Sequence, residues 1–197
     1  GIQVNYFKTY KRKNNSFLSI LLDYFSYIFV ILFKLKYLNK FKPNSVLTFA
    51  TSPLLQAIPA IIYAKIKKTP SILWVQDLWP EVLEDTGYIK NQFILSVINL
   101  LVKKIYSSSD LILAQSNSFK KHIIKKYNLK NKTCVLHQPS EIKFQKFKKN
   151  LKKNVIFTFA GNLGQAQDFE TILNAFLSKQ LNKNILLYII GSGNKFE

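Results

Sequence analysis

Apolar runs of strand length alternate along the chain with longer segments in which apolar residues recur at helical spacing. The short runs predict strands over residues 45–50, 71–75, 111–114, 133–136, 155–160 and 185–190, and a further strand over 2–7. The longer segments predict helices over residues 17–38, 53–67, 91–106, 117–127 and 168–177. Ser52 suits the N-cap of the helix 53–67, and Ser116, at the start of the polar stretch 116–118, suits that of the helix 117–127. This alternation is typical of an α/β fold, in which helices flank a mostly parallel sheet.

A lysine-rich stretch with little apolar periodicity interrupts the pattern at residues 141–154 and predicts a basic linker. We expect one domain over residues 1–140 and the beginning of a second over 155–197, because a single strand–helix–strand fragment cannot close a doubly wound sheet. The chain begins with Gly1 and contains no methionine. We therefore expect it to be a piece of a longer polypeptide.

Composition places the chain among globular proteins, since 48% of its 197 residues are hydrophobic and 20% are charged. Its single cysteine, Cys134, is expected in a strand core, and a chain with one cysteine fits a reducing, cytoplasmic compartment. The apolar segment 17–38 contains Asp23, Lys34 and Lys36, so we expect a buried or interfacial helix rather than a membrane span.

The charge balance is strongly basic, with 29 lysines and arginines against 10 acidic residues and a net charge of +19. Such an excess suggests an anionic partner, such as nucleic acid, lipid headgroups or a phosphate-bearing ligand. Arg12 is the only arginine, which weakens the nucleic-acid interpretation because base and phosphate recognition favour the guanidinium fork. A biased background composition also explains much of the lysine.

The first candidate site follows the predicted strand 71–75, where four acidic residues and both tryptophans lie within twelve positions. Ligands of parallel sheets bind at the carboxyl ends of strands. Asp77 or Glu81 is suited to accept a hydroxyl proton or a hydrogen bond, and Trp79 to stack on an apolar ring face or to meet a membrane interface. The alternative is structural, with Asp77 capping a turn and the tryptophans filling the core.

The second candidate site is the glycine-bearing loop after the predicted strand 155–160, which contains Gly161 and Gly164. Backbone amides of such a loop, together with the following helix N-terminus, suit a phosphate, although the spacing is neither a P-loop nor a dinucleotide fingerprint. A plain tight turn is the alternative. We expect His122 to be an exposed surface residue and His137 to line a cleft at a strand end. No residue cluster has metal-ligand spacing.

Four motifs, in their order and spacing, give the chain a family resemblance: WVQDLWPE at 74–81, LHQPSE at 136–141, FAGNLGQAQ at 159–167 and IGSG at 190–193. The sequence resembles the family 4 glycosyltransferases, retaining enzymes with two Rossmann-like domains in the GT-B fold. It is most similar to the branch that transfers N-acetylfucosamine-type sugars in bacterial O-antigen, capsule and colanic acid synthesis. The resemblance implies a GT-B type fold with an acceptor-side N-terminal domain and a nucleotide-sugar-binding C-terminal domain.

The resemblance also implies roles for particular residues. Gln76 stands where many family members have a histidine, so it would hydrogen-bond the acceptor together with Trp79 and His137, beside the candidate catalytic residues Asp77 and Glu81. The donor diphosphate would face two loops, which contain Gly161, Asn162, Gly164, Gln165, Gly191 and Gly193. Asn162 and Gln167 stand near the positions of the family's charge-neutralising arginine and lysine. The family's E-x7-E element and its first glycine-rich turn are not found.

The leading hypothesis is therefore a glycosyltransferase without a metal or cofactor, using a nucleotide-diphosphate sugar as co-substrate. Its acceptor would be a polyprenyl-diphosphate-linked saccharide at the cytoplasmic face of the inner membrane, where the enzyme would be peripheral. We expect the 197-residue chain alone to be inactive or nearly so. The alternatives are a lysine-rich module that binds nucleic acid or membrane without catalysis, and a degenerate fragment without function.

Overall fold

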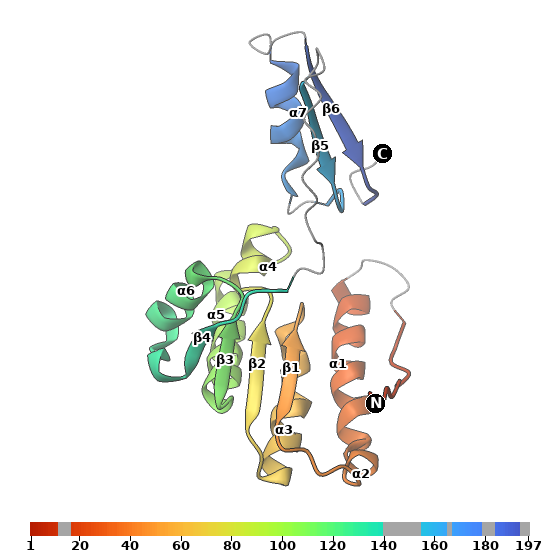
Figure 1. Cartoon of the computed structure of the whole chain (residues 1–197), viewed down its shortest axis with the longest axis vertical. Helices are drawn as coiled ribbons and strands as arrows, with labels where there is room; N and C mark the ends of the chain where they lie inside the picture. Colours follow the sequence, from red (N-terminus) through yellow and green to blue (C-terminus); the bar gives the residue numbers. More distant parts are fainter. Residues whose placement is uncertain (12–16, 140–154, 165–166, 179–183, 194–197) are drawn as a thin grey trace. The chain divides into compact units, whose positions relative to one another are not determined.

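A computed structural model of the chain describes residues 1–11, 17–139, 155–164, 167–178 and 184–193 (Figure 1). The chain divides into two compact units, Gly1–Pro139 and Ser140–Glu197, which we call unit 1 and unit 2. The predicted linker 141–154 lies outside the described residues. The assignment of the two units to an acceptor-side and a donor-side domain stays a prediction.

Unit 1 contains a four-stranded sheet in the order β1-β2-β3-β4, with every neighbouring pair parallel (Figure 1). The strands are β1 (Val46–Ala50), β2 (Ser71–Val75), β3 (Leu111–Ala114) and β4 (Thr133–Val135). Their sequence order matches their order in space, so each strand is joined to its neighbour by a crossover. The predicted α/β class with a parallel sheet and flanking helices is confirmed, and this architecture is consistent with a Rossmann-like N-terminal domain of the GT-B type.

Helices join and flank the strands of unit 1. They are α1 (Phe17–Phe33), α2 (Leu35–Leu38), α3 (Ala57–Lys67), α4 (Glu81–Asp85), α5 (Gln92–Ser108) and α6 (Asn117–Tyr127). Because parallel strands are joined by right-handed crossovers, a sheet whose strands are added in one direction places its connecting helices α3, α5 and α6 on the same side. A hydrophobic core forms between these helices and the sheet.

Alternate strand residues show which side of the sheet is covered. Leu73, Val75 and Ile112 are at most 1% exposed and face the helices. Leu47 and Phe49, which alternate with them across the pleat, are 56% and 48% exposed. Cys134 is also exposed, so its predicted place in the core was wrong. It follows the buried Thr133 in the short strand β4, and successive side chains of a strand point to opposite faces of the sheet.

Local side-chain bonds explain where the helices begin. The predicted cap of α6 is confirmed, since the Ser116 hydroxyl accepts a hydrogen bond from the backbone amide of Phe119. The predicted cap of the 53–67 helix was wrong. A 3₁₀ turn (Leu54–Gln56) precedes α3, and the hydroxyl of Ser52 donates to Asp77 instead.

The N-terminal segment corrects a second expectation, because residues 2–7 do not form a strand. Isolated hydrogen bonds rather than a ladder attach the N-terminal residues 1–11 to α1 and α2: Tyr10 N donates to Ser26 Oγ, and the Tyr37 hydroxyl donates to Asn5 Oδ1. The predicted helix 17–38 is divided into α1 and α2 at Lys34. Within the described part of the chain, no helix has both the length and the apolar character that crossing a membrane requires.

Unit 2 repeats the strand–helix–strand pattern. Strands β5 (Val155–Ala160) and β6 (Ile185–Ile190) are parallel neighbours, and α7 (Phe169–Leu177) connects them in sequence. Phe157 of β5 meets Phe176 of α7 edge-to-face, with ring centroids 5.5 Å apart. The helix therefore packs on the strands through aromatic contacts.

Asp110, which precedes β3, forms hydrogen bonds to Ser71, the first residue of β2, and these bonds can be tested. Its Oδ2 accepts from the backbone amide of Ser71 at 2.8 Å and from the Ser71 hydroxyl at 2.9 Å. The hydrogen bond from the Ser71 backbone amide, followed by that from its hydroxyl, lowers the pKa of Asp110 below its ordinary value. We predict that Asp110→Asn lowers the free energy of unfolding by about 1 kcal/mol at neutral pH.

A lowered carboxyl pKa contributes stability above the unfolded pKa, and this contribution is lost as the pH falls through the folded pKa. The difference in the free energy of unfolding between Asp110→Asn and the parent should therefore become smaller below about pH 4. Urea unfolding at pH 7 and at pH 3 measures it, with Asp85→Asn in the exposed end of α4 as the control. An equal difference at both pH values would contradict the prediction.

Candidate functional site

Polar side chains follow each of the four strands of unit 1. Ser52 follows β1, Gln76 and Asp77 follow β2, Gln115 follows β3, and His137 follows β4. The strands are parallel, so their carboxyl ends meet at one edge of the sheet, where ligands of α/β proteins bind. We call this group, together with Gln138, the strand-end cluster.

Asp77 is held in place by a short chain of hydrogen bonds. The Ser52 hydroxyl donates to Asp77 Oδ2 at 2.8 Å, and the indole Nε1 of Trp79 donates to Ser52 Oγ at 3.1 Å. Trp79 is 5% exposed and belongs to the hydrophobic core. Its ring is therefore buried, as the structural alternative for the tryptophans expected, and acceptor binding by Trp79 stays a prediction.

Gln76 is 7% exposed and is the most constrained member of the strand-end cluster. Its backbone amide donates to the carbonyl of Ala50, and its backbone carbonyl accepts from Gln115 Nε2 at 2.6 Å. Its side-chain Oε1 accepts from Gln138 Nε2. Its side-chain Nε2 is buried without a hydrogen-bond partner in the described part of the chain.

An unpaired buried amide donor costs about 1–3 kcal/mol, so the Nε2 atom of Gln76 is an unsatisfied polar group within the strand-end cluster. The hydrogen bond expected between Gln76 and a sugar hydroxyl stays a prediction. His137 joins the same cluster, because its Nδ1 lies 3.0 Å from the carbonyl oxygen of Gln115. The structure thus brings together Gln76 and His137 through Gln115.

Glu81 takes part in a different set of contacts. It begins α4, and its Oε1 contacts Lys126 Nζ and lies 2.8 Å from Nε2 of His122, both on α6. Burial acts to raise the pKa of Glu81, but the hydrogen bond and charge of Lys126, with the charge of His122, lower it below its ordinary value. Glu81 therefore stays ionised and ties α4 to α6, and its catalytic role remains a prediction.

His122 corrects an expectation. We predicted an exposed surface histidine, but its side chain is 35% exposed and bonded to Glu81, which lies 41 residues earlier in the chain. No feature of the sequence around residue 122 indicates this pairing, because the two residues meet only after α4 and α6 pack.

The glycine loops of unit 2 contact each other closely. A Cβ atom at Gly191 would lie 1.8 Å from the carbonyl oxygen of Gly161, and one at Gly193 would lie 2.4 Å from that of Leu163. Two backbone hydrogen bonds join the loops: Gly161 N to Ile190 O and Leu163 N to Ser192 O, each 2.9 Å. The loops after β5 and β6 therefore form one backbone platform that excludes side chains at residues 191 and 193.

This platform differs in detail from a phosphate cradle. The backbone amide of Gly164 donates to Gln167 Oε1 at 3.1 Å, and those of Gly161 and Leu163 are used between the loops. Asp168 and Glu170 stand at the N-terminus of α7. Their negative charges lie at the positive end of the helix dipole, which is the end that would otherwise attract a phosphate. Gln165 lies outside the described residues. Donor binding by Gly161, Asn162, Gly164, Gly191 and Gly193 stays a prediction.

Sequence reasoning missed Ser52 and Gln115. Ser52 was interpreted as a helix cap, although its place after a strand is the same signal that selected Asp77. Gln115 follows β3 in the same way. Metal ligands were not expected, and the part of the chain that the structure describes contains no group of three or more histidine, cysteine or acidic residues suited to hold a metal ion.

The chain is similar to an uncharacterized glycosyltransferase of Methanocaldococcus jannaschii, with 29% identity over 177 residues. The match covers 81% of this chain but 42% of that protein, so the chain spans less than half the length of its curated relative. No protein-family model matches the chain. The similarity supports a relationship to glycosyltransferases and does not distinguish family 4 or its O-antigen branch.

The contact of Glu81 with Lys126 predicts a measurable coupling between α4 and α6. Glu81 and Lys126 have side chains that are 25% and 29% exposed, so solvent screens them less than a fully exposed pair. In a double-mutant cycle with Glu81→Gln and Lys126→Met, we expect a coupling free energy of about 1 kcal/mol in urea unfolding. Additive effects of the two changes would show that the pair contributes nothing to stability.

The close approach of the glycine loops predicts a sharp contrast between two substitutions. Gly191→Ala should destabilise unit 2 by about 3 kcal/mol or more, because its Cβ would overlap the Gly161 carbonyl. Gly161→Ala is the matched control, since its Cβ would meet only the Phe159 ring at 3.9 Å. Hydrogen exchange of the β5 and β6 amides measures the stability of unit 2 in both variants. Equal exchange in the two variants would contradict the close contact between the glycine loops.

Proposed function

We propose that this chain is part of a glycosyltransferase that moves a sugar from a nucleotide-diphosphate sugar to a hydroxyl of an acceptor. Three observations support the proposal: the similarity to a glycosyltransferase over most of the chain, the parallel sheet of unit 1, and the strand-end cluster at its ligand-binding edge. The activity proposed is that of the whole protein to which these residues belong.

The observation that carries the proposal is the pair Gln76 and Asp77. Gln76 offers a buried, unpaired amide donor, and the next residue offers a carboxylate held by Ser52. An amide donor and a carboxylate acceptor that follow the same strand suit a sugar hydroxyl, which both gives and accepts hydrogen bonds. Asp77 would accept the hydrogen bond of the attacking hydroxyl, and Gln76 would orient the acceptor ring.

The donor would lie against unit 2. The backbone platform of Gly161 and Gly191 admits close approach of a nucleotide diphosphate, because no side chain projects from it at residue 191 or 193. The two acidic residues at the start of α7 disfavour the diphosphate at that helix end, so the proposed contact is with the loops themselves.

The finer parts of the proposal concern the acceptor and its location. We propose a polyprenyl-diphosphate-linked saccharide as the acceptor, in a pathway of bacterial surface polysaccharide synthesis, with the enzyme peripheral to the cytoplasmic face of the inner membrane. The support is the net charge of +19, which suits a diphosphate at an anionic surface. Retention of configuration and membership of family 4 rest on the sequence resemblance.

The experiment compares Asp77→Asn and Gln76→Ala with the parent protein. Asp77→Asn keeps an oxygen that accepts from Ser52 but removes the proton acceptor, so sugar transfer should fall about a hundredfold. Gln76→Ala should reduce transfer by about tenfold through loss of an orienting hydrogen bond. Labelled sugar from a panel of nucleotide-diphosphate sugars, offered to a polyprenyl-diphosphate saccharide, measures transfer in the whole protein.

Asp85→Asn is the matched control, because Asp85 belongs to the same acidic run but lies in the exposed end of α4. The thermal midpoint of each variant shows whether the protein remains folded. Unchanged transfer in both Asp77→Asn and Gln76→Ala would assign the strand-end cluster to structure alone.

A further inference from the structure

Helix α1 exposes a row of large apolar side chains. Leu22, Phe25, Phe29 and Phe33 are 45%, 47%, 56% and 83% exposed. Their spacing of three, four and four residues places them on one side of a helix. We call these four residues the α1 stripe. Contiguous exposed apolar surface of this kind marks an interaction site in most proteins that have it.

The opposite side of α1 is already used for packing. Ile28 is 8% exposed, and Tyr24 packs against the hydrophobic core. Tyr27 and Ile31 line a groove of about 240 Å³ together with residues of β1 and α3. The α1 stripe therefore points away from the packed side of the helix, and α1 is apolar on two sides.

The charge around α1 identifies the kind of partner. Residues 1–42 contain one acidic residue, Asp23, against eight basic ones: Lys8, Lys11, Arg12, Lys13, Lys34, Lys36, Lys40 and Lys42. Lys34 and Lys36 lie one and three residues after Phe33, the last residue of the stripe. Large apolar side chains with lysines beside them are typical of helices that lie in the interface of an anionic bilayer.

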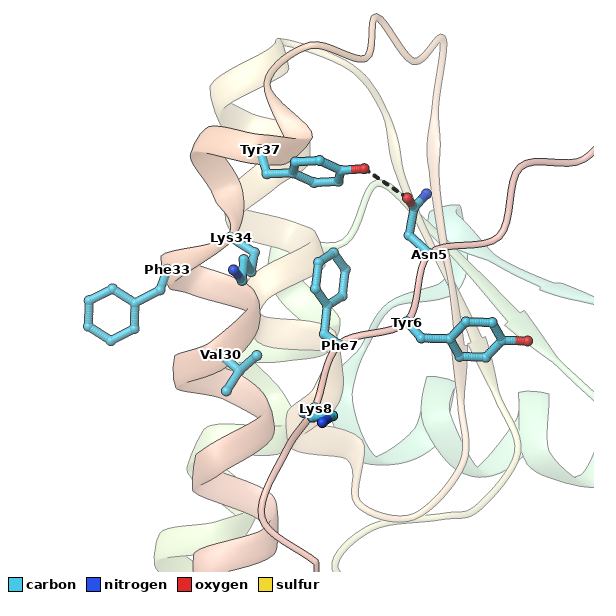
Figure 2. A pocket seen from close by; sticks show the side chains of 8 residues that line it. All are labelled: Asn5, Tyr6, Phe7, Lys8, Val30, Phe33, Lys34 and Tyr37. Carbon is cyan, nitrogen blue, oxygen red and sulfur yellow. Dashed lines mark hydrogen bonds between the residues drawn. The ribbon is translucent and has the colours of Figure 1, made fainter.

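The carboxyl end of α1 shows how the two kinds of side chain are arranged. A hollow of about 570 Å³ is lined there by Lys8, Lys34 and Tyr37, among others. Phe33, Lys8 and Lys34 all border this hollow, and Figure 2 shows the ring of Phe33 directed outward from α1, away from the contact between Tyr37 and Asn5. Tyr37 closes one side of it through its hydrogen bond to Asn5, 3.0 Å long.

We propose that the α1 stripe inserts into the headgroup region of an anionic lipid bilayer, with α1 parallel to the membrane plane. The phenylalanine rings enter the apolar boundary, and the lysines at the end of the helix and in the hollow contact lipid phosphates. At 17 residues α1 is shorter than a spanning helix, which agrees with an in-plane position. This surface deepens the proposed function by assigning its membrane contact, and its test requires no sugar transfer.

The experiment is co-sedimentation of the chain with vesicles of phosphatidylcholine alone and of phosphatidylcholine with phosphatidylglycerol. We expect binding to the anionic vesicles that weakens as salt is raised from about 0.05 to 0.5 M, because the lysine contribution is screened. The triple variant Phe25→Ser, Phe29→Ser, Phe33→Ser should bind at least about tenfold more weakly, since it removes the inserted rings.

A matched control tests whether any exposed apolar helix gives the same result. Helix α5 exposes Phe93, Val97 and Leu100, at 77%, 44% and 66%, with a spacing similar to that of the α1 stripe. The triple variant Phe93→Ser, Val97→Ser, Leu100→Ser should retain binding. Phe33→Ser alone, at the most exposed residue of the stripe, keeps the test valid if the triple variant of α1 does not fold, and should weaken binding severalfold.

Several outcomes would overturn the proposal. These are absence of binding to anionic vesicles, equal binding by the α1 variants and the parent, or an equal loss in the α5 variant. If the α1 variants change the size of the particle in gel filtration but not vesicle binding, the stripe is covered by a second protein chain instead. Asp77→Asn should bind vesicles like the parent, so failure of the membrane contact and failure of the transfer chemistry are distinguishable.

Discussion

Two backbone hydrogen bonds extend the sheet of unit 1 beyond its strands. The amide of Gln76 donates to the carbonyl of Ala50 at 3.0 Å, and that of Leu136 donates to the carbonyl of Ala114 at 2.9 Å. These bonds carry the parallel ladder one residue past the ends of β2 and β4. The polar residues that follow the strands are consequently attached to a rigid edge, and the geometry of the strand-end cluster depends on this continuation.

Much of this arrangement is predictable from the sequence. Strands β2, β3, β5 and β6 have the predicted bounds, because short apolar runs flanked by polar residues are typical of parallel strands. The segment 2–7 is also rich in residues that favour strands but has no strand beside it, and a strand forms only by pairing with a neighbour. Cys134 was misplaced for a related reason, since the pattern does not show that one side of the sheet is uncovered.

In the candidate site, the sequence pattern predicts which residues follow the strands, but it does not predict the contacts that form when helices pack together. The place of Gln76, Asp77 and His137 follows from their position after predicted strands. The partner of Glu81 does not, because Lys126 is 45 residues away and the contact depends on how α4 meets α6. Ser52 shows the same limit: a hydroxyl between a strand and a proline suits a helix cap equally well, and only the structure shows its bond to Asp77.

The chemistry proposed for unit 2 has a consequence for charge. The backbone amides of Gly161, Leu163 and Gly164 are bonded within the loops, so they supply shape rather than positive potential. Neutralising a diphosphate then requires side-chain cations, and 28 of the 29 basic residues are lysines. Lysine is a flexible point charge without the bidentate geometry of arginine. A site built in this way would bind its donor through charge and obtain its selectivity from the shape of the glycine platform.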